Sequence, residues 1–254
     1  MTVGEVYIFL DSIAPFSLQQ SYDNSGICAG SRDIEVTRIL TALDITHEVV
    51  DEAERLGCEL IISHHPVIFR PIRVATLENP AVRVAALGKA AICAHTSFDS
   101  AEGGMNDLLA ERLGLTTIEP LDFDEGKPMG YICETPESFT AEQLAALCKE
   151  KLGCRVVRFT PCEGGITKVG VCSGSGGSLL GAAKAKGCGA LITGDCKHSD
   201  FVTARNERFC LIDAGHFHTE NIFHEKLAAK LKEQFPAVEV IKSEAFTDPA
   251  DYVI

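Results

Sequence analysis

The stretch RILTALDITHEVVDEAERLGCELIISHH, residues 38–65, decides the fold class of this chain. Residues 38–45 are rich in apolar and β-branched side chains and predict a strand. Residues 47–57 carry apolar side chains at helical spacing, and 59–64 predict a second strand. A strand, a helix and a strand joined by short turns form a βαβ unit with parallel strands. The alternation continues with a helix over 81–89, a strand over 90–95 and a helix over 105–114, so the sequence predicts an α/β protein with mainly parallel sheets.

A second copy of this pattern lies in the other half of the chain. Strand, helix and strand are predicted over 167–174, 178–187 and 189–195. Thr167, Gly187 and Cys188 repeat residues found 130 positions earlier, at 37, 57 and 58. Chance likeness between two stereotyped βαβ units and internal duplication both explain this repeat, and we favour duplication.

The repeat leads us to expect two similar α/β lobes. The first covers 1–125 and the second 126–254, with a segment at about 209–225 returning to a site shared with the first lobe. The polar segment 122–130, which contains Gly and Pro, is expected to cross between the lobes. Thr140 is expected to cap a helix over 139–153.

Composition narrows the class of protein. Thirty-six acidic against 23 basic residues give a net charge of −13, which disfavours nucleic acid as a partner. No run approaches the roughly 18 apolar residues of a membrane span, so we expect no membrane association. The eleven cysteines are odd in number, show no C-x-x-C spacing and follow no secretory leader, which favours a reducing cytoplasm.

Imidazole and carboxylate side chains follow three of the predicted strands. His64 and His65 end the strand at 59–64, and Pro66 cannot continue it. Neighbouring strand residues face opposite sides, so both histidines serve one metal only if the chain leaves β geometry there. A chelate of one ion, one imidazole on each of two ions, and two solvent-exposed histidines all remain open for the pair.

The other two strand ends extend this theme. His95 and Asp99 follow the strand at 90–95, and His216 and Glu220 follow an apolar run ending at Asp213. In a helix, His216 and Glu220 lie one turn apart on the same face and can clamp a divalent ion. The carboxyl ends of parallel strands are where open sheets bind ligands. The imidazoles and two carboxylates at these strand ends, with bridging groups and an open position, fit a two-metal hydrolytic centre better than a structural zinc site.

Other polar residues give weaker signals. The Gly-rich loop at 173–177 either presents backbone N–H groups to an anion or is only a tight turn. Asp195 and His198 follow the strand that repeats 59–64, and we hypothesise that they meet substrate. His218 faces away from the His216 stripe and His224 lies farther from the strand end, so neither is assigned as a ligand.

The motifs taken together resemble one family over nearly the whole chain, the NGG-interacting factor 3-like or GTP cyclohydrolase 1 type 2-like proteins. The matching elements, in family order, are YDNSGICAG (22–30), LDIT (43–46), IISHHPVIF (61–69), AHTSFDSAEGGMND (94–107) and LIDAGHFHTE (211–220). The resemblance implies two α/β lobes with a metal site in the cleft between them, often assembled as a hexameric ring. It implies metal ligation by His64, His65, Asp99, His216 and Glu220, with Asp99 as the bridge. Residues 126–165 are too short for the inserted domain that some members carry.

The expected function is a cytoplasmic hydrolase with two divalent metal ions, zinc, iron or manganese, acting on an unidentified small molecule. The family's cyclohydrolase name implies a nucleotide such as GTP. His95 is expected to transfer a proton from just outside the ligand shell. The alternative is a metal-binding scaffold or regulatory interaction protein without enzymatic activity.

Overall fold

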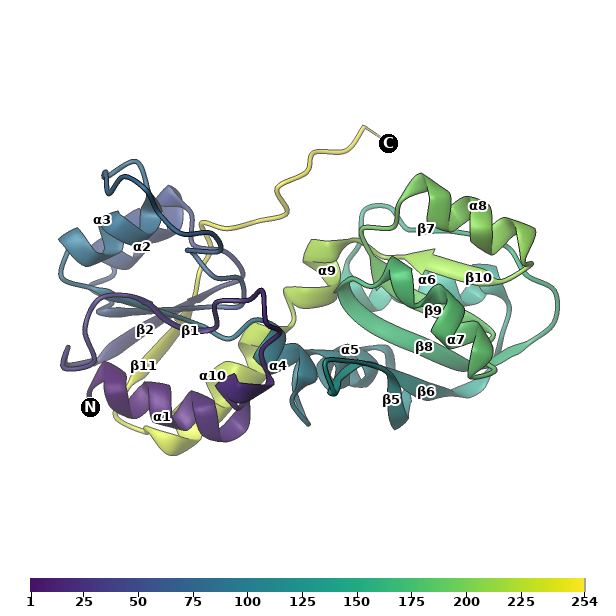
Figure 1. The fold of residues 1–254 in the computed structure, drawn as a ribbon, viewed down its shortest axis with the longest axis horizontal. Helices are drawn as coiled ribbons and strands as arrows, with labels where there is room; N and C mark the ends of the chain where they lie inside the picture. The colour runs from purple at the N-terminus through teal and green to yellow at the C-terminus, as the bar shows by residue number, and fades with distance from the viewer. Residues whose placement is uncertain (254) are drawn as a thin grey trace. The chain divides into compact units, whose positions relative to one another are not determined.

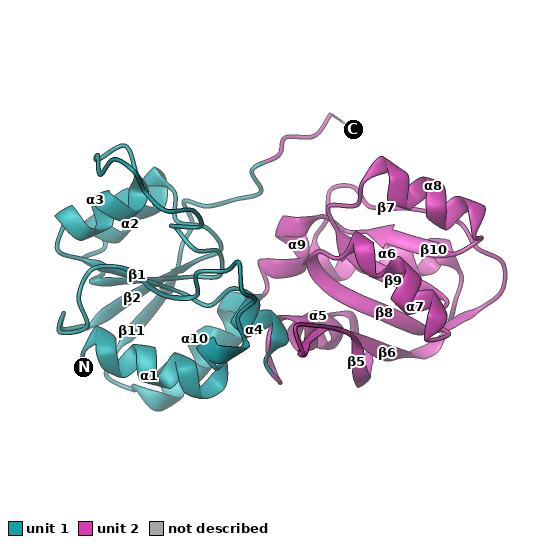
Figure 2. Ribbon diagram, in the orientation of Figure 1, with its two compact units in different colours: residues 1–101, 223–249 teal, residues 102–222, 250–254 magenta. Residues whose placement is uncertain are grey.

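The computed structural model describes residues 1–253, and their internal contacts divide them into two compact units (Figure 2). Unit 1 contains Met1–Ala101 and Phe223–Pro249, and unit 2 contains Glu102–Ile222 with the residues from Ala250 onward. Each unit has its own sheet and its own apolar core. The last helix and the last strand of the chain therefore belong with its first hundred residues.

Unit 1 is built on a five-stranded sheet in the order β1-β4-β3-β2-β11. Its strands are β1 (Gly26–Ala29), β2 (Arg38–Ala42), β3 (Leu60–Ser63), β4 (Ala90–Cys93) and β11 (Glu239–Lys242). The strands from β4 to β11 run parallel, and β1 at the edge is antiparallel. The predicted parallel sheet is thus confirmed in this unit. Every residue of β3 and β4 is buried, as expected for strands covered on both faces.

Helices cover both faces of the unit 1 sheet, α2 and α3 on one and α1 and α10 on the other (Figure 1). The helices are α1 (Val3–Ile13), η1 (Phe16–Leu18), α2 (His47–Arg55), α3 (Pro80–Ala86), α4 (Thr96–Ser100) and α10 (Phe223–Gln234). Thr46 caps α2 and Asn79 caps α3 through side-chain oxygens that accept from backbone N–H groups. Leu40, Val49 and Val84 belong to the buried cluster that joins β2, α2 and α3.

Unit 2 is built on a six-stranded sheet in the order β5-β6-β8-β9-β10-β7. Its strands are β5 (Thr116–Asp124), β6 (Lys127–Phe139), β7 (Arg158–Phe159), β8 (Ile166–Ser175), β9 (Ala190–Gly194) and β10 (Cys210–Asp213). The strands β8, β9 and β10 run parallel, but the other three pairings are antiparallel. The second sheet is therefore mixed, whereas the sequence predicted a mainly parallel one.

The predicted crossover at 122–130 is wrong, because this segment is the tip of a β-hairpin. Asp124 pairs with Lys127 across a two-residue turn, Glu125-Gly126, in which both φ angles are positive (49° and 78°). This geometry is that of the tight turns that join antiparallel strands. The strand before the turn was hard to recognise because Leu121 is its one buried residue, so it lacks an apolar alternation.

The helices of unit 2 include those that the sequence predicted over 105–114, 139–153 and 178–187. The helices are α5 (Met105–Leu113), α6 (Ala141–Leu152), η2 (Gly177–Leu179), α7 (Leu180–Ala185), α8 (His198–Asn206) and α9 (His216–Glu220). The predicted cap at Thr140 is confirmed, since its hydroxyl accepts from Gln143 N and the Gln143 side chain accepts from Thr140 N. Ile132, Leu180 and Leu211 belong to the core cluster of this unit.

Two further expectations concern the whole chain. All eleven cysteines are free thiols and nine are buried, in keeping with their use as small apolar core residues. Within residues 1–253, none of the helices combines the length and the apolar character that crossing a bilayer requires.

Candidate metal centre

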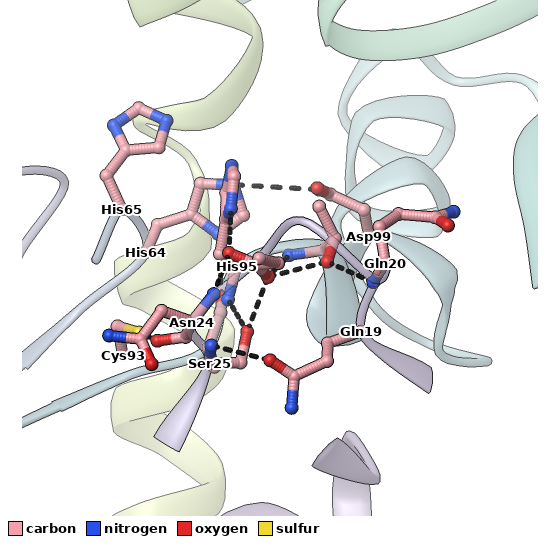
Figure 3. Close-up of polar contacts among 12 residues, drawn as sticks. Gln19, Gln20, Asn24, Ser25, His64, His65, Cys93, His95 and Asp99 are labelled. Carbon is pink, nitrogen blue, oxygen red and sulfur yellow. Dashed lines mark hydrogen bonds and ion pairs between the residues drawn. The ribbon is translucent and has the colours of Figure 1, made fainter. Parts of the chain in front are cut away.

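Three histidines converge at the carboxyl edge of the unit 1 sheet (Figure 3). His64 and His65 directly follow β3, and His95 follows β4, which is its parallel neighbour. The ring centroids are 5.0 Å apart for His64 and His65, and His95 lies 5.3 Å and 5.4 Å from these two. One ring nitrogen from each residue lies within 4.8 Å of the other two, so this group could hold a metal ion.

The chain leaves strand geometry at the histidine pair, as joint use of both imidazoles requires. The strand β3 ends at Ser63, whose hydroxyl donates to the carbonyl of His65 at 2.7 Å. The His65 N–H then donates to the carbonyl of Leu43, just beyond β2, at 3.0 Å. These two bonds fix a bend, so that consecutive histidines bring their rings together instead of facing opposite sides of the sheet.

An oxygen acceptor holds Nδ1 of each imidazole. The partners are the carbonyl of Ala94 for His64 (2.9 Å), Asp44 for His65 (3.0 Å) and Asp23 for His95 (2.8 Å). A carbonyl or carboxylate only accepts, so Nδ1 carries the hydrogen and the lone pair of a neutral imidazole lies on Nε2. Histidines that bind metals in proteins are oriented in this way. The donor set therefore fits a divalent metal ion.

Asp23 is the most heavily bonded of these acceptors. It accepts from Nδ1 of His95, from the N–H and hydroxyl of Thr96, and from the hydroxyl of Ser25. Burial alone would raise the pKa of Asp23, but these hydrogen bonds and the charge of His95 hold it well below its usual range. Burial likewise opposes a charged His95, yet Asp23 and then Asp99 raise the pKa of that imidazole. The pair favours a proton on His95.

Asp99 adds a carboxylate to the histidine cluster. It lies in α4, which begins directly after His95, and its Oδ1 is 3.6 Å from Nε2 of His64 (Figure 3). Two ligands that are each about 2.1 Å from one tetrahedral ion lie about 3.4 Å apart. The His64–Asp99 separation is therefore compatible with two ligands of a single ion.

Unit 2 contributes a His–Glu pair of its own. The helix α9 begins at His216, and Nε2 of His216 lies 2.9 Å from Oε2 of Glu220, one turn later. The predicted i, i+4 arrangement is thus confirmed. Asp195, which follows β9, accepts from Nδ1 of His216 at 2.8 Å. Its φ of 50° is unusual for a residue other than glycine, so the chain is bent to present this carboxylate.

The Gly-rich loop at 173–177 packs against this pair, and three of its backbone N–H groups bond to side chains of the protein. The backbone N–H groups of Ser173, Gly174 and Gly176 donate to the side chains of Asn106, Thr219 and Thr193. A Cβ atom at Gly174 would lie 2.3 Å from Oε1 of Glu220. The loop is therefore a close-packed turn whose glycine makes room for the glutamate.

The remaining polar residues of the motifs have structural partners. Asp213 accepts from Arg158, Cys196 N and Gly215 N, which joins the loops after β9 and β10. His224 belongs to unit 1 and is buried against β2, where its Nδ1 lies 3.2 Å from the hydroxyl of Thr41. Burial lowers the pKa of His224 to about 3, so this histidine is a neutral core residue.

Sequence reasoning missed the orienting roles of Asp23, Asp44 and Asp195. Asp23 and Asp44 lie in the motifs YDNSGICAG and LDIT, but nothing in those letters identifies the histidine that each one meets. Asp195 was expected to meet substrate, and the structure pairs it with His216. A useful signal was available: each of these aspartates stands just before or after a strand, where ligand histidines also gather.

The chain is similar to known proteins in both sequence and fold. The family model described as Duf34/NIF3 (NGG1p interacting factor 3) matches residues 1–249. A "GTP cyclohydrolase 1 type 2 homolog" of Clostridium perfringens is 33% identical over all of both chains. The "GTP cyclohydrolase 1 type 2" of Helicobacter pylori is 31% identical over 87% of this chain and 88% of its own. Among solved structures, Staphylococcus aureus hypothetical protein SA1388 superposes with a TM-score of 0.91 at 28% identity, covering 100% of this chain and 99% of its own.

Proposed function

Because the chain belongs to the Duf34/NIF3 family, we propose that it is a dinuclear metal-dependent hydrolase acting on a nucleotide or a related heterocycle. The observation that carries the proposal is the set of three unit 1 imidazoles whose Nδ1 atoms are held by oxygen acceptors. The names of the relatives, GTP cyclohydrolase 1 type 2 and its homologs, support the substrate class.

We assign five residues as ligands of two divalent ions, zinc, iron or manganese. They would be His64, His65 and Asp99 together with His216 and Glu220, the ligand set that the family resemblance implies. Mixed imidazole and carboxylate donors suit these metals. When bound, such ions polarise a substrate carbonyl or phosphoryl group and lower the pKa of a coordinated water molecule toward neutrality.

The protein's own groups orient the ligands and move protons. Asp44 and Asp195 fix the ring orientation of His65 and His216 through their Nδ1 hydrogens. Asp23 fixes the ring of His95 through Nδ1, so Nε2 of His95 is suited to accept a proton and pass it to a leaving group. We therefore keep His95 as the proton-transfer residue, although its ring also lies within the histidine cluster.

The second candidate function is a metal-binding scaffold or regulator without turnover. The description of the matching family as an interacting factor favours this alternative. Either function is expected in the cytoplasm and in a homo-oligomer, with a hexameric ring as the form that the resemblance suggests.

Metal analysis combined with a substrate screen tests the proposal. The purified protein is assayed for bound metal, stripped with a chelator, reloaded with zinc, iron or manganese, and screened against nucleotides, phosphoesters and cyclic amidines. Glu220→Ala should lose turnover while remaining folded, whereas Glu233→Ala, an exposed glutamate near the end of α10, should match the wild type. Turnover that survives metal removal would contradict the hydrolase, and metal binding without turnover of any substrate would favour the scaffold.

A further inference from the structure

Two large aromatic side chains are exposed beside the unit 1 histidine cluster. Tyr22 is 60% exposed and Phe69 is 48% exposed. Their ring centroids are 6.4 Å apart with the ring planes tilted by 59°, and the centroid of the Phe69 ring lies 6.3 Å from that of the His95 imidazole. Neighbouring aromatic rings left open to solvent are a common mark of a binding surface.

Hydrogen bonds brace the segments that carry the two rings. The side-chain amide of Asn24 donates to the carbonyl of Ile68 at 2.7 Å, which ties the loop after Tyr22 to the turn that holds Phe69. Asp23, next to Tyr22, is bonded to His95. The two rings and the imidazole therefore belong to one hydrogen-bonded framework, so a ligand that contacts the rings meets a preorganised surface.

The segment that carries Phe69 also differs in charge from the rest of the chain. Residues 66–77 contain Arg70 and Arg73 and no acidic residue, whereas the whole chain has a net charge of −13. Both arginines are exposed. A guanidinium binds phosphate through paired N–H donors, so this segment favours a ligand with an anionic group.

We propose that Tyr22 and Phe69 form an aromatic platform for the planar ring of a nucleotide, which stacks on one of the two rings and meets the other, tilted ring at its edge. The platform thereby sets the specificity of the adjacent metal centre. The proposal rests on the proposed function for the identity of that centre. Stacking on an aromatic face tolerates any base because every base has a π face, so the platform selects nucleotides over phosphoesters that lack an aromatic ring. Arg70 and Arg73 would favour the nucleotide over its nucleoside.

Binding to the metal-stripped protein tests the platform apart from catalysis. Equilibrium dialysis measures the dissociation constants of GTP, guanosine and ribose 5-phosphate for the wild type, Tyr22→Ala and Phe69→Ala. We expect each substitution to weaken GTP and guanosine binding about tenfold to a hundredfold and to leave ribose 5-phosphate unchanged. Phe69→Tyr should retain binding, and thermal melting shows whether each variant is folded. Phe123→Ala, which removes a 58% exposed ring from the unit 2 hairpin, is the matched control.

The outcomes separate this inference from the proposed function. If Phe69→Ala weakens GTP binding and the metal-loaded protein hydrolyses nothing, the result supports the platform and contradicts the proposed hydrolase function. If the metal-loaded protein hydrolyses nucleotides and Phe69→Ala changes neither their dissociation constants nor their KM values, the platform is overturned and the hydrolase stands. Equal weakening by Phe69→Ala and Phe123→Ala would also overturn the platform.

Discussion

Two regions of the molecule share a framework and differ in chemistry. In unit 1, β2, α2 and β3 cover 38–63, and in unit 2, β8, α7 and β9 cover 166–194. Ile39 pairs with Leu60 in the first, and Val169 pairs with Ala190 in the second. The strand register therefore repeats at the offset of 130 residues found in the sequence.

The turns that follow the helices repeat as well. Gly57 and Gly187 both have positive φ (68° and 77°), and in each case the next residue, a cysteine, donates its N–H to an alanine carbonyl five residues earlier. The third strands repeat with a shorter offset, since Leu60 pairs with Ala90 and Ala190 with Cys210. This agreement in register favours duplication over chance likeness.

The difference lies at the strand ends. At positions 130 apart, unit 1 has Asp44 just after β2 and unit 2 has Gly174 near the end of β8. After the second strand, unit 1 has His65 and unit 2 has Asp195. In unit 1 a carboxylate after the first strand orients a histidine after the second, whereas in unit 2 a carboxylate after the second orients His216 after the third. Each unit therefore has an imidazole–carboxylate pair, and the pair in unit 2 lies one strand later in the repeated order of strands.

The largest expected effect comes from removing the most buried imidazole of unit 1. His64→Ala should weaken metal binding more than about 100-fold. Removing a group that only hydrogen-bonds to a ligand histidine already lowers metal affinity about 10- to 100-fold. Metal titration of the stripped protein measures this change. His198→Ala, at the exposed start of α8 in unit 2, is the matched control. Similar affinities for the two variants would contradict a metal centre at the unit 1 strand ends.

Substitution of the glycine that replaces Asp44 in unit 2 should affect folding next most strongly. Gly174→Ala places a Cβ 2.3 Å from Glu220 at a positive φ of 61°, so we expect a loss of about 2–4 kcal/mol in the free energy of unfolding. Gly187→Ala also has a positive φ but meets no atom within 4 Å, and should cost about 1–2 kcal/mol. Urea denaturation compares them, and equal losses would show that contact with Glu220 is unimportant.

The two orienting carboxylates should have matching, smaller effects on the metal. Asp44→Ala and Asp195→Ala should each lower metal affinity by about 10- to 100-fold, because each frees one imidazole to rotate. Metal titration checks both variants alongside turnover. If Asp195→Ala leaves metal affinity and turnover unchanged while Asp44→Ala lowers them, the two carboxylates do not have the same role in the two units.

The smallest expected effect is a pH dependence of stability caused by His224, which lies in α10, outside the repeated segments. The pKa of His224 is about 3 in the folded protein and about 6.5 when unfolded, so the unfolded chain binds the extra proton first as pH falls. The free energy of unfolding therefore falls below pH 6.5, by about 1 kcal/mol between pH 7 and pH 5.5. Urea denaturation at both values should show a smaller loss for His224→Gln than for the wild type or His198→Gln. An equal loss in all three would contradict a neutral buried His224.

The sequence predicted secondary structure well where a local residue pattern lies beside the candidate site residues. The apolar runs around Ile61 and Ile92 identified β3 and β4 to within two residues, and the spacing of His216 and Glu220 identified α9. Long-range pairing was less visible. The strand β11 is four residues long and finds its partner β2 about two hundred residues away, which no local pattern encodes. The partners of His65 and His95 were missed for the same reason, because each depends on the direction of a side chain beyond a strand end.

The position of β11 in the sheet has a consequence for biosynthesis. Thr41 pairs with Lys242, so the ribosome must pass residue 242 before the sheet that holds the histidines can close. Until then the β2 edge is open to pairing with another nascent chain. A premature stop codon between residues 96 and 239 leaves every histidine of that sheet's cluster encoded while exposing an aggregation-prone edge.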